Sequence, residues 1–91
     1  MKAVELQPGS FLNHNNLGMA YGKLGENEKA AGEFEIALKL NPSYARAYTN
    51  LGLMRYRLGQ VEEARGLWQK ALEVDPQFEE ARRALRLLEA R

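Results

Sequence analysis

The sequence predicts an all-α fold built from antiparallel helix pairs, and two observations support this prediction. Between residues 45 and 74, apolar residues recur at spacings of three and four, as on the buried face of an amphipathic helix. The same pattern occurs one unit earlier, and Pro8, Pro42 and Pro76 stand at a constant spacing of 34 residues. A period of this length predicts repeated helix pairs that bury their apolar faces against their neighbours.

The unit at residues 45–78 shows this pattern most clearly. Gly59 ends its first helix, because glycine adopts a left-handed backbone without a steric penalty, and Pro76 bars continuation of the second. Trp68 fills the space between the two helices, while small residues let their backbones approach. The apolar positions of this unit are Tyr48, Leu51, Met54, Leu58, Ala64, Leu67, Trp68, Ala71, Leu72 and Val74.

The unit at residues 11–44 repeats this arrangement, with Ser10 as the expected N-cap and Gly25 as the stop of the leading helix. Glu33 is expected on the solvated face of the return helix. We expect these residues to face inward: Leu17, Ala20, Tyr21 and Leu24 on the leading helix, and Ala30, Phe34, Ala37, Leu38 and Leu40 on the return helix.

The two ends of the chain differ from the central units. Residues 1–10 are predicted to be the end of a preceding repeat, because the segment 2–8 has the same pattern as 70–76, and the chain is interpreted as a fragment of a longer array. A short natural cap is the alternative. Residues 79–91 are predicted to form a closing helix with one apolar stripe and otherwise charged faces.

These residues resemble the tetratricopeptide repeat (TPR) family over the whole chain. The first unit matches the family's small and large positions at Leu17, Gly18, Tyr21, Gly25, Ala30, Phe34, Ala37 and Pro42. Two departures are His14, where a large residue is expected, and Arg55 in place of the aromatic that matches Tyr21. The resemblance implies a right-handed α-solenoid of antiparallel helix-turn-helix repeats that spans residues 1–91 as a single module.

Composition and motifs argue against several classes of function. The net charge of +1 gives no general attraction to nucleic acid or membranes, and no apolar run approaches the ~18 residues of a membrane span. The chain lacks cysteine, which favours the cytoplasm over an exported location. The only histidine, His14, has no cysteine or second histidine to act with, and neighbouring glutamates on helices diverge. We therefore expect no enzymatic activity, metal or cofactor.

The predicted function is that of a protein-interaction scaffold whose concave groove binds an extended peptide. Asn16 and Asn50 recur one period apart, and their amides either bind a peptide backbone or hydrogen-bond between helices. The basic groups on Lys23, Arg46 and Arg57 favour a ligand that carries carboxylates. By the resemblance, the peptide-binding residues are Asn16, Met19, Lys23, Arg46, Asn50, Leu53 and Arg57, and Leu12, Asn15 and Thr49 are further exposed groove positions.

Some family members clamp the C-terminal carboxylate of heat-shock chaperones with lysine, asparagine and arginine on successive leading helices. This chain resembles only part of that set, because its last helix offers Glu80 and Ala84 instead, so the resemblance does not predict chaperone docking. Two alternatives remain open. One is self-association through the N-terminal segment, where Ala3, Val4 and Leu6 lack a partner helix, and the other is the substrate-presenting arm of a larger enzyme.

Overall fold

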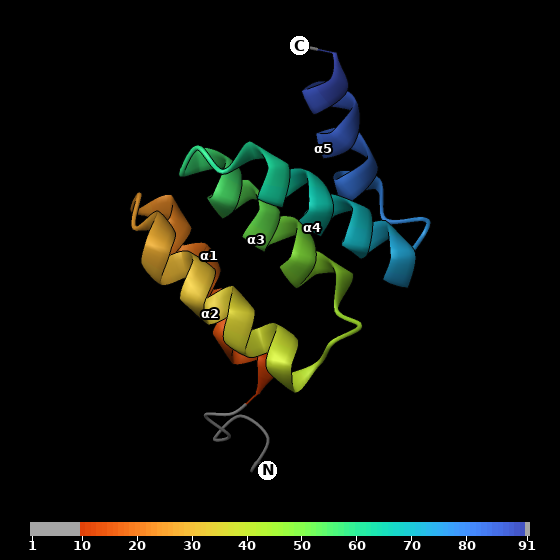
Figure 1. Cartoon of the computed structure of the whole chain (residues 1–91). Coiled ribbons are helices and arrows are strands. Elements are labelled where there is room, and N and C mark those ends of the chain that lie inside the picture. Colours follow the sequence, from red (N-terminus) through yellow and green to blue (C-terminus); the bar gives the residue numbers. More distant parts are fainter. Residues whose placement is uncertain (1–9, 91) are drawn as a thin grey trace.

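The computed structural model describes residues 10–90, and this part of the chain contains five α-helices and no strand. The helices are α1 (Phe11–Lys23), α2 (Asn27–Leu40), α3 (Ala45–Arg57), α4 (Val61–Val74) and α5 (Glu79–Glu89). They follow one another as two hairpins, α1–α2 and α3–α4, with α5 packed on the second (Figure 1). The predicted all-α repeat architecture is confirmed. Between residues 10 and 90, no helix combines the length and apolar character that a membrane span requires.

Both hairpin turns contain a glycine that has the left-handed backbone expected from the sequence. The φ angles of Gly25 and Gly59 are 82° and 84°. Next to them, the backbone N–H of Glu26 donates to the carbonyl of Tyr21 at 2.9 Å, and that of Gln60 donates to the carbonyl of Arg55 at 2.8 Å. These bonds satisfy carbonyls that the last turn of a helix leaves without partners, so each leading helix ends at a defined residue.

Each hairpin is closed by an aromatic ring that lies against a glycine of the leading helix. A Cβ atom added to Gly18 would lie 2.7 Å from Cε1 of Phe34, and one added to Gly52 would lie 2.4 Å from Nε1 of Trp68. The Trp68 indole N–H also donates to the carbonyl oxygen of Thr49 at 3.0 Å. The absence of a side chain at these two glycines therefore fixes how closely the paired helices approach.

The core continues from one hairpin to the next. Phe34 and Ala31 of α2 pack with Leu51 and Met54 of α3, and this cluster joins the two hairpins. A second cluster joins α3, α4 and α5, and its buried members are Ala45, Ala64, Trp68, Ala71, Ala81 and Leu88. Helices therefore pack in sequence order, each against its neighbours, as in other helical repeat proteins.

Several expected positions differ from the structure. Leu17 is 43% exposed, whereas Leu51 at the same place in the next unit is 5% exposed. The difference arises because α2 covers Leu51, while no helix between residues 10 and 90 covers the corresponding face of α1. Leu24 and Leu40 are also exposed. The prediction that these three leucines face inward was wrong, as it was for Ala20, which is exposed.

One polar expectation was wrong, and one was right in position only. Glu33 was expected on the solvated face but is only partly exposed, because its Oε1 lies 2.7 Å from Nδ1 of His14. His14, which stands where the family has a large packing residue, thus contacts a carboxylate of α2. Ser10 stands at the N-cap of α1, but its hydroxyl makes no capping hydrogen bond. The expectations for residues 1–9, including Ala3, Val4 and Leu6, lie outside the described residues.

Candidate functional site

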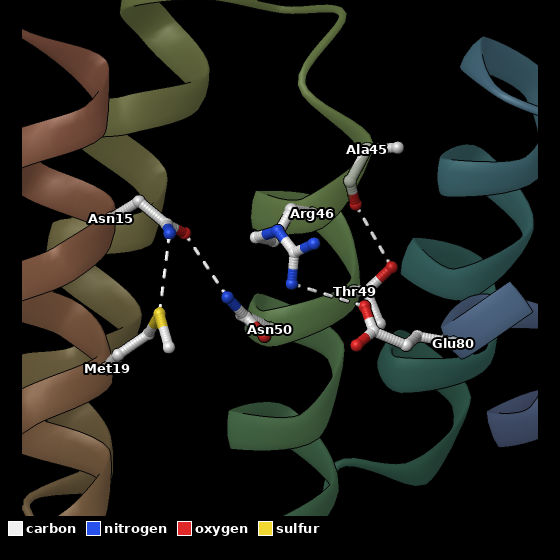
Figure 2. Close-up of polar contacts among 7 residues, drawn as sticks. All are labelled: Asn15, Met19, Ala45, Arg46, Thr49, Asn50 and Glu80. Carbon is white, nitrogen blue, oxygen red and sulfur yellow. Dashed lines mark hydrogen bonds and ion pairs between the residues drawn. The ribbon is translucent and has the colours of Figure 1, made fainter. Parts of the chain in front are cut away.

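Side chains from α1, α3 and α5 meet on one face of the molecule (Figure 2), and adjoining hollows along this face form what we call the groove. The α1–α3 hollow is lined by Gly18, Met19, Gly22, Lys23, Phe34, Asn50, Leu53, Met54 and Arg57. The α3–α5 hollow is lined by Leu53, Tyr56, Trp68, Ala84, Leu87 and Leu88. Between them, a third hollow is lined by Thr49, Asn50, Leu53, Trp68, Glu80 and Ala84. Leu53 borders all three.

The asparagines link α1 to α3. A side-chain N–H of Asn50 donates to Oδ1 of Asn15 at 3.2 Å, and Nδ2 of Asn15 donates to the sulfur of Met19 at 3.5 Å (Figure 2). Asn15 is only 2% exposed, so its expected place among the exposed groove residues was wrong. Asn50 thus takes part in the helix-to-helix hydrogen bonding that the sequence left open, and it keeps its side-chain oxygen and one N–H for other partners.

Arg46 is already paired with α5. Its Nη1 lies 3.4 Å from Oε1 of Glu80, and its guanidinium carbon lies 5.6 Å from the centre of the Phe78 ring. Figure 2 shows this guanidinium extending from α3 toward Glu80. Since both partners are well exposed, the pair contributes little to stability. It nevertheless neutralises the charge that was expected to attract an acidic ligand.

Arg57 reaches back to the end of α1. Its Nη1 donates to the carbonyl oxygen of Gly22 at 3.2 Å and lies 3.5 Å from Oδ1 of Asn27. A cation at the C-terminal turn of a helix interacts favourably with the helix dipole and with carbonyls that have no partner within the helix. The guanidinium of Arg57 therefore connects the second hairpin to the first while it borders the α1–α3 hollow.

Lys23 and Asn16 differ from these residues in having no polar partner. Both side chains are exposed, and neither takes part in a hydrogen bond or ion pair in the described part of the chain. Lys23 borders the α1–α3 hollow, whereas Asn16 borders none of the hollows described above. Lys23 is thus a basic group of the groove that has no partner among the described residues and is available to a carboxylate.

The structure therefore gathers most of the predicted site residues in one place. Met19, Lys23, Asn50, Leu53 and Arg57 border the α1–α3 hollow, while Asn16 and Arg46 lie apart from it. The sequence reasoning did not identify Gly22, Tyr56 or Leu87 as groove residues. A signal for the first two was present, because Gly22 and Tyr56 stand at the same position of the two units but differ completely in size.

Outside the groove, His14 is the one histidine of the chain. His14 contacts a single carboxylate, that of Glu33. From residue 10 to residue 90, no three histidine, aspartate or glutamate side chains are grouped as metal ligands would be.

Comparisons with known proteins agree with this architecture. A sequence profile described as Tetratricopeptide repeat matches residues 15–77. The first TPR of Spaghetti (RPAP3), bound to the HSP90 peptide SRMEEVD, is 31% identical with a TM-score of 0.85, over 92% of this chain and 67% of that one. The first TPR domain of human RPAP3 is 30% identical with a TM-score of 0.87, over 94% and 68%.

A third solved structure, the second TPR domain of human RPAP3 in complex with the HSP70 peptide SGPTIEEVD, is 27% identical with a TM-score of 0.85, over 94% and 72% of the two chains. Comparison with curated protein sequences gave no match. The chain spans about two thirds of the length of the first two of these structures. The profile covers most of the sequence, and two of these solved structures have a sequence identity of 30% or more to it. The chain therefore belongs to the tetratricopeptide repeat family, a family of protein-interaction scaffolds.

Proposed function

We propose that this chain binds an extended, acidic segment of a partner protein in the groove formed by α1, α3 and α5. The observation that carries the proposal is the α1–α3 hollow, where apolar side chains form the floor and polar or basic groups of Lys23, Asn50 and Arg57 stand at its border. Binding sites for peptides commonly combine an apolar surface with a few polar groups that fix the ligand's orientation.

Asn50 is the residue best placed to hold a peptide backbone. Its hydrogen bond to Asn15 fixes the orientation of the amide, and the groups that remain are one acceptor and one donor, which match a peptide N–H and C=O. Because Asn50 borders both the α1–α3 hollow and the third hollow, a peptide that runs along the groove passes this amide.

Acidity of the ligand is supported by Lys23 and by two similar structures. Those proteins bind the peptides SRMEEVD and SGPTIEEVD, which carry several carboxylates. Here, however, α5 presents Glu80 and Ala84 to the groove, and the Glu80 carboxylate is paired with Arg46. We therefore propose that acidic side chains, rather than a C-terminal carboxylate, are recognised.

The proposal can be tested with the peptide SRMEEVD, its C-terminal amide and peptides selected from a displayed random library. Affinities would be measured by fluorescence anisotropy. We expect acidic peptides to be enriched and the amide of SRMEEVD to bind as tightly as the free acid. Asn50→Ala should weaken binding by about 1–3 kcal/mol, as for loss of a partner that leaves a desolvated group unpaired.

Lys39→Ala is the matched control for Lys23→Ala. Both lysines stand in the last turn of a helix, both are exposed and neither has a polar partner in the described chain, but Lys39 lies on α2, outside the groove hollows. Lys23→Ala should weaken binding and Lys39→Ala should not. The proposal is wrong if no peptide is enriched, or if the groove variants bind the selected peptides as tightly as the parent chain.

Self-association is a second candidate function, favoured by the exposed Leu17 of α1 and the exposed Leu24 directly after this helix. Apolar side chains that α2 covers in the second unit are open here and could pack against another copy. Sedimentation over a range of concentrations tests this function, and a monomer at all concentrations would exclude it.

A further inference from the structure

We infer that the groove recognises two apolar side chains of one extended peptide, one on each side of Leu53, together with a carboxylate beside the first of them. This inference rests on the proposed function and specifies the chemistry of the ligand. It follows from the lining of the α1–α3 and α3–α5 hollows and from the distribution of charge between them.

Gly22 borders the α1–α3 hollow and adds no side chain to it. A Cβ atom at Gly22 would lie 3.4 Å from Sδ and Cε of Met54, so any larger side chain would extend into this space. The hollow measures about 190 Å³. An apolar cavity of about 150 Å³ accommodates benzene, so a leucine, methionine or phenylalanine side chain fits this volume.

The α3–α5 hollow is also apolar, and no charged side chain lines it. It measures about 220 Å³, and Trp68, Leu88 and Ala84 contribute to its lining. Leu87 borders the opening and is 66% exposed, which is unusual for a leucine that lies beside other apolar groups. Covering this surface with an apolar side chain removes apolar area from water and is therefore favourable.

Leu53 connects the two hollows, since it lines both and is itself partly exposed. The amide of Asn50 lies along the same path, because it borders the third hollow together with Leu53. A single extended peptide that crosses Leu53 therefore places one side chain in each hollow while its backbone reaches Asn50.

Charge distinguishes the two hollows and selects the ligand. Lys23 and Arg57 border only the first, and the Arg57 guanidinium already has two acceptors within the chain. The ammonium of Lys23, which has no partner between residues 10 and 90, thus favours a carboxylate next to the apolar side chain in the α1–α3 hollow. No such group stands at the α3–α5 hollow.

The test selects peptides from a displayed random library on the parent chain and on variants that fill one hollow each. Gly22→Leu fills the first hollow, Ala84→Leu fills the second, and Gly66→Leu is the control, because a Cβ at Gly66 meets nothing within 4 Å and Gly66 borders neither hollow. The parent and the control should select two apolar positions with an acidic residue beside one of them.

Each filled variant should lose one preference and keep the other. Gly22→Leu should no longer select the apolar residue beside the acidic one, and Ala84→Leu should no longer select the second apolar residue. Peptides selected on the parent should bind the matching variant about 10- to 100-fold more weakly, the range for a lost apolar side-chain contact in a pocket. Met19→Gln and Leu87→Gln, at partly exposed positions, provide the same comparison if a filled variant does not fold.

The outcomes separate this inference from the proposed function. Enrichment of acidic peptides without apolar preferences, or the same preferences on Gly22→Leu as on the parent, would overturn the inference and leave the proposed function standing. Failure to enrich any peptide would overturn both. If the parent dimerises and Gly22→Leu does not, the hollow is a contact between copies of the chain, and the inference is wrong.

Discussion

Adding one methyl group at Gly52 should destabilise this protein, although the same change elsewhere in the hairpin should stabilise it. In a helix interior, alanine is favoured over glycine by about 1 kcal/mol. At Gly52, however, the new Cβ would lie 2.4 Å from Nε1 and 2.7 Å from Cδ1 of Trp68. The indole would have to move, and it is held by the partly buried hydrogen bond to Thr49.

The expected magnitude follows from these opposing effects. Overpacking a core costs about 1–3 kcal/mol, and loss of the indole hydrogen bond adds about 1 kcal/mol. After the gain in helix propensity, Gly52→Ala should lower the free energy of unfolding by about 1–3 kcal/mol. In a domain of this size, each kcal/mol lowers Tm by about 4–8 °C.

The control is Gly66→Ala on α4, where the added Cβ meets nothing within 4 Å. It should raise the free energy of unfolding by about 0.5–1 kcal/mol. Urea denaturation followed by circular dichroism measures both variants, and the slope with denaturant should stay the same. If Gly52→Ala raised the midpoint as Gly66→Ala does, the contact between ring and backbone would not limit the approach of the helices.

Three further predictions concern single side chains. Trp68→Ala should lower the free energy of unfolding by about 3–5 kcal/mol, measured in urea, because it leaves a cavity between α3, α4 and α5. Glu33→Ala should lower the free energy of unfolding by about 1 kcal/mol because His14 loses its partner, whereas the control Glu63→Ala, at an exposed position, should change it by less than about 0.5 kcal/mol. Equal values for the two variants would contradict this prediction. Lys23→Ala should weaken a selected acidic peptide about twofold to fivefold and reduce the dependence of its affinity on salt, as measured by anisotropy at two ionic strengths.

The period of the sequence was sufficient to predict the helices, because each helix pair contains its own stop signals. With Gly25 as its expected stop, α1 ends at Lys23, and Gly25 and Gly59 have the backbone predicted for them. Periodicity cannot tell whether a neighbour covers a given face. Leu17 and Leu51 have the same place in their units, yet only Leu51 has α2 beside it.

The groove was predicted less completely because its polar contacts depend on residues about one repeat apart. Glu80 pairs with Arg46, Gly22 with Arg57 and Asn15 with Asn50, and none of these pairs is evident from spacing on a single helix. Asn15 was expected to be exposed, but it is buried. Neighbouring residues of a helix point about 100° apart, so an error of one residue in the expected face places a buried amide on the exposed side. The Arg55–Glu35 ion pair joins α3 to α2 over 20 residues, and spacing on a single helix does not reveal it either.

The position of Trp68 gives this chain an internal optical reporter. It is the only tryptophan, and its ring lies under two of the three hollows of the groove while its N–H is bonded to Thr49. Indole emission depends on the polarity around the ring. A side chain that enters the α3–α5 hollow therefore displaces water beside the fluorophore, whereas one that enters the α1–α3 hollow, which Trp68 does not line, leaves it unchanged. Unlabelled protein can thus distinguish which half of the groove a ligand occupies.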